Sequence, residues 1–167
     1  MRQLTRFMAA AAATVMTATS GALALGASVA AADDTSGRVV PLSSVLRRCD
    51  WSSAPYVPSD SRGSGYAVIS QNGSTASADI YIQAMRPDIW YGVRFIQVPR
   101  PGIGCGAGDP GVGMARIYTD GAGNGSATVS APLMNGATGA WVSVEGPLGV
   151  QNQLTGDFWT SDYVASF

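Results

Sequence analysis

The sequence contains no histidine, no lysine and only two cysteines in 167 residues. Without histidine, Ser-His-Asp and Cys-His catalysis and imidazole ligation of a metal are excluded. Without lysine, a Schiff base and a lysine-containing phosphate-binding loop are excluded. Two cysteines are too few for a four-thiolate zinc or iron–sulfur site. These absences leave carboxylates as the candidate acids and bases, and they predict a protein without a metal or an organic cofactor.

Charge is also scarce, since only 13% of the residues are charged and none lies between Arg6 and Asp33. Arg2 and Arg6 precede an apolar run over residues 7–26, and Ala30–Ala32 offers a cleavage site of the A-x-A type. This order predicts a signal peptide over residues 1–32, cleaved before Asp33. We therefore expect a secreted or cell-envelope-associated protein. A core helix or an uncleaved anchor is the alternative, because the uncharged stretch is long enough to span a membrane.

Cleavage of 32 residues leaves a chain of 135 residues with eight arginines and eleven acidic residues, a formal charge of −3. That length suits a single domain. The weak negative charge argues against binding to nucleic acid or to an anionic membrane, which both favour a basic face. We expect no stable membrane insertion after cleavage. Export to an oxidising compartment predicts a disulfide between Cys49 and Cys105.

The cleaved chain shows two kinds of pattern. Residues 33–64 are expected to be irregular because they are rich in Pro, Gly and Ser, although Val39–Leu46 suits a short strand or one helical turn. From Gly65 onward, seven short runs alternate between apolar and polar residues: 65–71, 75–84, 89–98, 114–119, 126–131, 139–145 and 158–167. Asn72-Gly73 is a strong hairpin signal between the first two runs. The pattern predicts an all-β fold, a single immunoglobulin-like β-sandwich of about seven strands over residues 65–167.

The segment from Met85 to Phe95 carries a recognisable strand-entry pattern. Pro87 precedes a run in which Tyr91 and Val93 alternate with other residues. This resembles the fibronectin-III and immunoglobulin-like pattern in which Pro precedes a strand opening with x-Tyr-x-Val. The resemblance implies that the Tyr91 hydroxyl bonds to nearby backbone and holds a corner between sheets. Its meaning is therefore structural.

The order of the parts resembles small exported immunoglobulin-like proteins of high-GC Gram-positive bacteria, most of them without an assigned activity. The shared parts are the signal, the Pro-x-x-x-Tyr strand, a hairpin over Thr119–Gly125 and an apolar C-terminal strand. The apoproteins of the neocarzinostatin type share the Asp-x-x-Gly-Asn-Gly turn, here Asp120–Gly125, and an aromatic C-terminus. They have two disulfides where this chain has two cysteines, so their ligand-carrying role does not transfer to it.

Two glycine-rich segments match functional motifs only formally. Gly106-x-Gly108-x-x-Gly111 has the dinucleotide-binding spacing, but Pro110 interrupts it and a strand-like run follows instead of a helix. We interpret it as a long loop tethered by Cys105. Asp120–Gly125 lacks the acidic ligands of a calcium loop and is interpreted as a hairpin turn.

Outward aromatic residues are the candidate contact residues. In residues 139–145, Val142 and Val144 suit the core, and strand geometry then directs Trp141 to the opposite face. Trp90 and Trp141 are therefore expected to grip a cell-wall glycan or an extracellular protein partner. The alternative is that residues 33–64 cover Trp141. The leading hypothesis is a non-enzymatic exported domain that acts by surface binding.

Two other hypotheses remain open. In a protease inhibitor, Val98–Pro101 would offer Arg100 as bait, because the prolines on both sides restrict the loop before binding. In a carboxylate-only hydrolase, the acid and base would come from a scattered set whose spacing predicts no catalytic pair. That set comprises Asp88, Asp109, Glu145, Asp157 and Asp162.

Overall fold

The computed structural model describes residues 37–54, 62–146 and 157–167. The expected signal peptide and its cleavage site before Asp33 lie outside these residues. The described residues contain nine strands and no helix, so the expected all-β class is confirmed. The strands are β1 (Arg38–Ser43), β2 (Ser64–Asn72), β3 (Thr75–Gln83), β4 (Trp90–Val98), β5 (Val112–Tyr118), β6 (Gly125–Pro132), β7 (Gly139–Gly146), β8 (Asp157–Ser161) and β9 (Ala165–Ser166). Every one of the seven predicted runs contains a strand.

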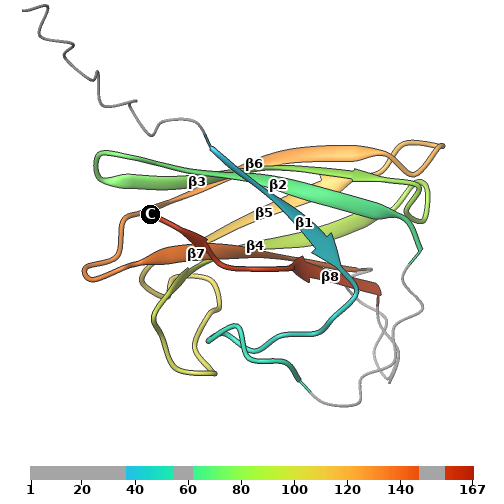
Figure 1. Ribbon diagram of the computed structural model, residues 1–167. Helices are drawn as coiled ribbons and strands as arrows, with labels where there is room; N and C mark the ends of the chain where they lie inside the picture. Colours follow the sequence, from blue (N-terminus) through green and yellow to red (C-terminus); the bar gives the residue numbers. More distant parts are fainter. Residues whose placement is uncertain (1–36, 55–61, 147–156) are drawn as a thin grey trace, which may run out of the picture. The chain divides into compact units, whose positions relative to one another are not determined.

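Hydrogen bonding joins these strands into one sheet with the order β5-β4-β7-β8-β1-β2-β3-β6, and β9 pairs with β7. Figure 1 shows β2, β3 and β6 lying over β4, β7 and β8, with β1 crossing from one layer to the other. Residues 38–42 of β1 pair with β2, and Leu42 and Ser43 pair with Ser161 and Thr160 of β8. The pairing is therefore continuous through β1, whereas the predicted sandwich has two separate sheets.

Strand β1 is the short strand that the sequence allowed over Val39–Leu46, within a segment otherwise expected to be irregular. Its apolar side chains Val40 and Leu42 are buried in the main core. Pro41 stands between them and is exposed, and its carbonyl accepts the Asp162 N–H at 2.9 Å. Because proline donates no hydrogen bond, it is tolerated where its own nitrogen is not needed for a ladder. The segment therefore forms a strand because it pairs with β2 and β8.

The core lies between the two layers and follows the predicted alternation. Large side chains of β4 and the β-branched residues of β7 meet the small and branched residues of β3. Each strand contributes every second residue: Ala76, Ala78, Ile80 and Ile82 from β3; Tyr91, Val93 and Phe95 from β4; Ala140, Val142 and Val144 from β7. The alternation predicted for these three runs is confirmed, and Val142 and Val144 face the core as expected.

The two ends of the sheet path, β5 and β6, approach each other closely. A Cβ atom at Gly113 of β5 would lie 2.7 Å from the Ser130 carbonyl oxygen of β6. A Cβ atom at Gly125 of β6 would lie 2.7 Å from the Tyr118 carbonyl oxygen of β5. Glycine is required at both places because the backbone of one strand occupies the space of the other's side chain. This close approach covers the two edges of the sheet.

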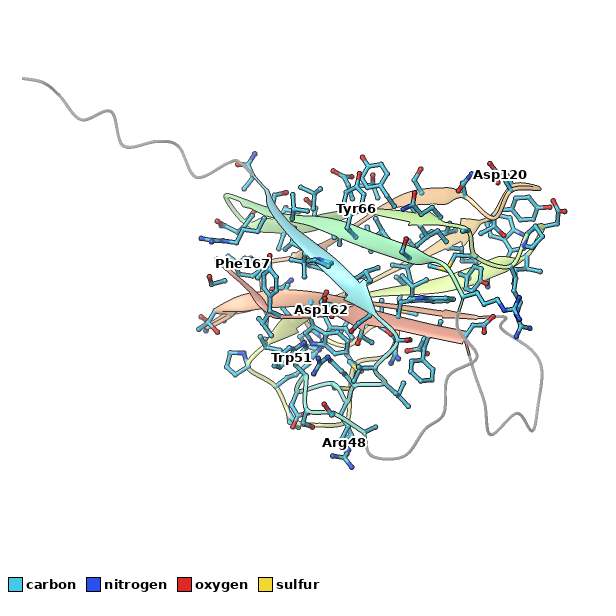
Figure 2. All side chains as sticks on the ribbon, turned by 45° about the vertical axis from the view of Figure 1, so that its right-hand side comes forward. Arg48, Trp51, Tyr66, Asp120, Asp162 and Phe167 are labelled. Atoms are coloured by element: carbon cyan, nitrogen blue, oxygen red, sulfur yellow. A yellow bond between two sulfur atoms is a disulfide. The ribbon has the colours of Figure 1, made fainter. Side chains whose placement is uncertain are left out.

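Two loops, residues 44–54 and 99–111, form what we call the disulfide cap. Cys49 and Cys105 are bonded within it, with their Cα atoms 5.6 Å apart, so the predicted disulfide is confirmed. The Cys49 N–H also donates to the Gly102 carbonyl at 3.2 Å. Figure 2 shows Trp51 and Arg48 of the cap on the opposite side of the strand layers from Tyr66.

The disulfide cap overturns the prediction that Trp141 is a surface residue and confirms the alternative that residues 33–64 help to cover it. Trp141 is fully buried in a second cluster with Ile96, Val98 and the two cysteines. Both faces of β7 are therefore covered, one by the main core and the other by the cap. The alternation in residues 139–145 was correct, but the face opposite the core is not a solvent face. Trp141 is a core residue and leaves the set of candidate contact residues.

Candidate functional site

Two stacked tyrosines occupy the outer side of the layer formed by β2, β3 and β6. Tyr66 of β2 and Tyr81 of β3 are partners in the strand register. Their ring centroids are 5.0 Å apart with an interplanar angle of 22°, and the side chains are 42% and 43% exposed. Ser126 of β6 is the next partner of Tyr81 across the sheet. The register therefore builds a flat aromatic surface with a hydroxyl at its edge.

The two tyrosines line a groove of about 490 Å³, which we call the tyrosine groove. Its polar lining comes from the end of β3, from the turn between β5 and β6, and from the start of β6. This lining includes Gln83, Asp120, Asn124 and Ser126. Figure 2 labels Tyr66 and Asp120 on this layer of strands. The volume lies in the range of small-molecule sites, which combine apolar surface with a few placed polar groups.

The wall of the groove is fixed by Asp120. Its Oδ1 atom accepts the backbone N–H of Asn124 at 2.8 Å and of Ala122 at 2.9 Å. These hydrogen bonds, led by the one from Asn124, lower the pKa of Asp120. The Asn124 Oδ1 atom in turn accepts the Ala84 N–H at 3.4 Å, joining the turn to the end of β3. The wall is therefore an ordered turn carrying a charged carboxylate at neutral pH.

The floor of the groove also holds an ordered amide. Gln83 donates from Nε2 to the Ser64 hydroxyl at 3.1 Å, across the β2–β3 pair. On the other side of the tyrosine pair, outside the groove, the Thr128 hydroxyl donates to Asp79 at 2.6 Å. Side-chain amides and hydroxyls both donate and accept hydrogen bonds. The groove can therefore stack a flat ring on the tyrosines and pair polar groups at the ring's edge.

Trp90, a predicted contact residue, lies elsewhere. It is 54% exposed on the outer side of β4, in the other layer of strands. Its register partner is Tyr118 of β5, and their rings are tilted at 54° with centroids 5.2 Å apart. The structure thus brings together neither Trp90 and Trp141 nor Trp90 and the tyrosine groove.

Arg100, the predicted bait residue, is folded against its own loop. Its Nη2 atom donates to the Pro110 carbonyl at 2.7 Å, and its Nε and Nη1 atoms are buried. Burial lowers the pKa of Arg100, opposed by the charge of Asp109. A protease-binding loop has to present this side chain to the enzyme, whereas here Arg100 is turned toward its own loop.

Tyr91 has the contacts that the strand-entry resemblance implied. Its hydroxyl accepts the Arg86 N–H at 3.3 Å, and its ring meets Trp159 edge-on with centroids 5.6 Å apart. The side chain is buried, and this desolvation raises the pKa of its hydroxyl. The bond ties the segment before β4 to the core, between the two strand layers.

Two of the acidic side chains considered for hydrolysis, Asp157 and Glu145, are engaged in structural contacts. Asp157 is buried and pairs with Arg86 at 2.8 Å. Glu145 pairs with Arg94 and accepts the Ser143 hydroxyl. Within residues 37–54, 62–146 and 157–167, no group of three or more Cys, Asp or Glu side chains is placed to hold a metal ion. That part of the chain also contains no helix long and apolar enough to cross a membrane.

No family model matches the chain, and no curated protein or solved structure shows significant similarity to it. The functional assignment therefore depends on the geometry of the chain itself. Of the two exposed aromatic pairs described above, the tyrosine pair is the one that lines the groove. Tyr81 lies in the alternating run 75–84, but nothing in the sequence singled out Tyr66 as its partner.

Proposed function

We propose that this protein is a non-enzymatic exported binding domain that holds an uncharged saccharide, such as a segment of a cell-wall glycan, in the tyrosine groove. The observation that carries the proposal is the stacked Tyr66–Tyr81 pair within a groove of about 490 Å³. An exposed pair of this kind is held ready by the strand register, so little ordering is required when a ligand binds.

The chemistry of the groove matches the two surfaces of a sugar ring. The faces of the ring carry C–H groups that pack on aromatic rings, and its edges carry hydroxyls. Gln83, Asn124 and Ser126 offer donors and acceptors beside the aromatic surface, and Asp120 offers a carboxylate acceptor. The lining named here includes no cationic side chain, which favours an uncharged ligand over an acidic one.

Two further features support the exported, immunoglobulin-like character of the domain. The Cys49–Cys105 disulfide suits an oxidising compartment outside the cytoplasm. With β1 set aside as an added strand, the path divides into β2-β3-β6 and β5-β4-β7-β8. The first, second and fifth strands then share one sheet, and the third, sixth and seventh share the other, as in immunoglobulin-like sandwiches. The fourth strand, β5, pairs with β4 in the second sheet, whereas the constant-type immunoglobulin domain has it in the first.

The test is calorimetric titration of the secreted protein with chitohexaose, cellohexaose and laminarihexaose as uncharged probes. We expect one of them to bind, and Tyr66→Ala and Tyr81→Ala each to weaken binding about tenfold or more. Trp90→Ala is the matched control, because it removes an equally exposed aromatic from the other layer. Thermal melts verify that all three variants fold. The proposal fails if none of the probes binds, or if both tyrosine variants bind as the wild type does.

Product analysis of the same mixtures separates binding from hydrolysis. A binding domain returns each oligosaccharide intact after prolonged incubation. The appearance of shorter sugars would instead assign a carboxylate-only hydrolase. The ion pairs and hydrogen bonds of Asp157 and Glu145 argue against that outcome.

A further inference from the structure

A second exposed surface lies on the outer side of β4 and β5, away from the tyrosine groove. We call it the β4–β5 face and define it by Asp88, Trp90, Met114, Arg116 and Tyr118. Its three large apolar side chains, Trp90, Met114 and Tyr118, are 54%, 50% and 48% exposed. Trp, Tyr, Met and Arg are the residues enriched in the centres of protein–protein interfaces. The composition therefore favours a protein partner on this face.

The charges on the β4–β5 face are arranged about its aromatic centre. Trp90 and Tyr118 are register partners, and the next partners along the strands on this side are Gly92 and Arg116. Asp88 lies beyond Trp90 in the other direction, where its Oδ1 atom accepts the Tyr118 hydroxyl at 3.5 Å. Arg116 lies two residues from Tyr118 along β5, a distance of about 7 Å, whereas Asp88 lies in the turn before β4. A negative and a positive charge thus lie on opposite sides of the aromatic pair.

Arg116 is the available positive charge of this face. It is exposed, and within the described ranges it makes no ion pair or hydrogen bond, while the neighbouring Arg94 is held by Glu145. Asp88 is likewise exposed and carries its charge beyond the aromatic pair. A surface with opposite charges on the two sides of an apolar centre is complementary to its own copy rotated by 180°.

We propose that the β4–β5 face binds the same face of a second copy of this chain. The two-fold axis passes through the Trp90–Tyr118 pairs, and Arg116 of each copy meets Asp88 of the other. Such an isologous interface uses one patch twice, so each ion pair forms twice. A different partner would have to supply an apolar surface and both charges in the reverse order. This proposal is independent of saccharide binding, because it uses a different layer of strands.

The test is analytical ultracentrifugation of the secreted protein over a concentration series from micromolar to millimolar. We expect a monomer–dimer equilibrium. Arg116→Asp alone and Asp88→Arg alone each place like charges opposite one another twice, and each weakens dimerisation about tenfold or more. An equimolar mixture of these two variants restores dimers, because both contacts of the mixed dimer join opposite charges. The double variant carrying both substitutions restores its own homodimer for the same reason.

Further variants keep the test independent of folding. Asp88 has a φ of 56°, which Asn tolerates well. Asp88→Asn thus removes the charge without disturbing the turn, and it weakens the dimer. Tyr81→Ala leaves dimerisation unchanged and affects only the saccharide. Trp90→Ala weakens dimerisation and leaves saccharide binding unchanged. The proposal is overturned if the wild type stays monomeric throughout, or if the charge-reversed variants associate as the wild type does while remaining folded.

Discussion

Trp141 of β7 lies directly opposite Ile96 of β4, and both side chains are fully buried beneath the disulfide cap. Trp141→Ala is therefore expected to lower the free energy of unfolding by about 3–5 kcal/mol, the usual cost of emptying a large buried aromatic site. Trp90→Ala should change it by no more than about 1 kcal/mol in dilute solution, because the ring is exposed and contacts another ring only at Tyr118. Urea denaturation of both variants measures the difference. If both variants lose the same small amount of unfolding free energy, Trp141 is not a buried core residue.

The misplacement of Trp141 shows which information the sequence does not contain. Alternation identifies the two faces of β7, and its prediction that Val142 and Val144 face the core is confirmed. The exposure of the other face of β7, which carries Trp141, depends on the disulfide cap. The cap is built from two loops whose sequences show no periodic pattern. The cap forms over this face because Cys49 and Cys105 bring the loops together from distant parts of the chain. Neither loop carries a local signal for that position.

Removal of the disulfide tests how far the cap depends on it. The two cysteines are 56 residues apart in sequence, and closing a loop of that length stabilises the folded state by about 4 kcal/mol in the chain-entropy model. The Cys49→Ala/Cys105→Ala double variant should lose stability of that order in urea. Its tryptophan emission should also shift to the red as water reaches Trp141. An unchanged denaturation midpoint would show that the cap holds through its packing alone.

Tyr91 gives a prediction with a defined pH dependence. Tyr91→Phe removes the acceptor of the part-buried Arg86 N–H, at a cost of about 1–3 kcal/mol near pH 7. Burial raises the pKa of the Tyr91 hydroxyl, so the folded state retains a proton that the unfolded chain releases near pH 10. The wild type thus has this stability below about pH 10 and loses it as the pH rises through the folded pKa.

Tyr91→Phe carries no such group, so the stability gap between the two proteins should narrow above about pH 10. Urea midpoints of both proteins across the alkaline range provide the measurement. Contributions from the other tyrosines cancel in the comparison, since both proteins contain them. A gap that stays constant to the highest pH would show that the hydroxyl is not desolvated.

The turn between β2 and β3 is shifted by one residue from the position that the sequence signal indicates. This shift decides which residue of β3 lies opposite Tyr66. The sequence signal Asn72-Gly73 places those two residues in the turn, which would pair Tyr66 with Asp79. In the structure the turn is Gly73-Ser74, Asn72 pairs with Thr75, and Tyr66 therefore meets Tyr81. Gly73 has a φ of 56° and occupies the first turn position, where a type II′ turn takes glycine. The sequence suits both turns, and the alignment of the whole strand pair decides between them.

Gly123 lies in the turn that forms the wall of the tyrosine groove. Its substitution should therefore affect both the stability of the fold and the binding of a saccharide. Gly123 has a φ of 79°, and a Cβ atom there would lie 2.2 Å from the Met85 carbonyl oxygen. Because that neighbour is backbone, Gly123→Ala has to displace the turn. We expect a loss of about 2–4 kcal/mol from the unfavourable φ and the overlap together. The displacement should also move Asp120 and Asn124 and weaken saccharide binding.

Gly121 in the same turn is the matched control, because a Cβ atom there would meet nothing within 4 Å. Gly121→Ala should therefore change stability by no more than about 0.5 kcal/mol and leave binding intact. Urea denaturation and titration with the best-bound oligosaccharide, performed on both variants, separate the two positions. If Gly123→Ala loses stability but binds the oligosaccharide as the wild type does, the turn is a structural element only. In that case the ligand does not contact this turn, and it lies on the opposite side of Tyr66.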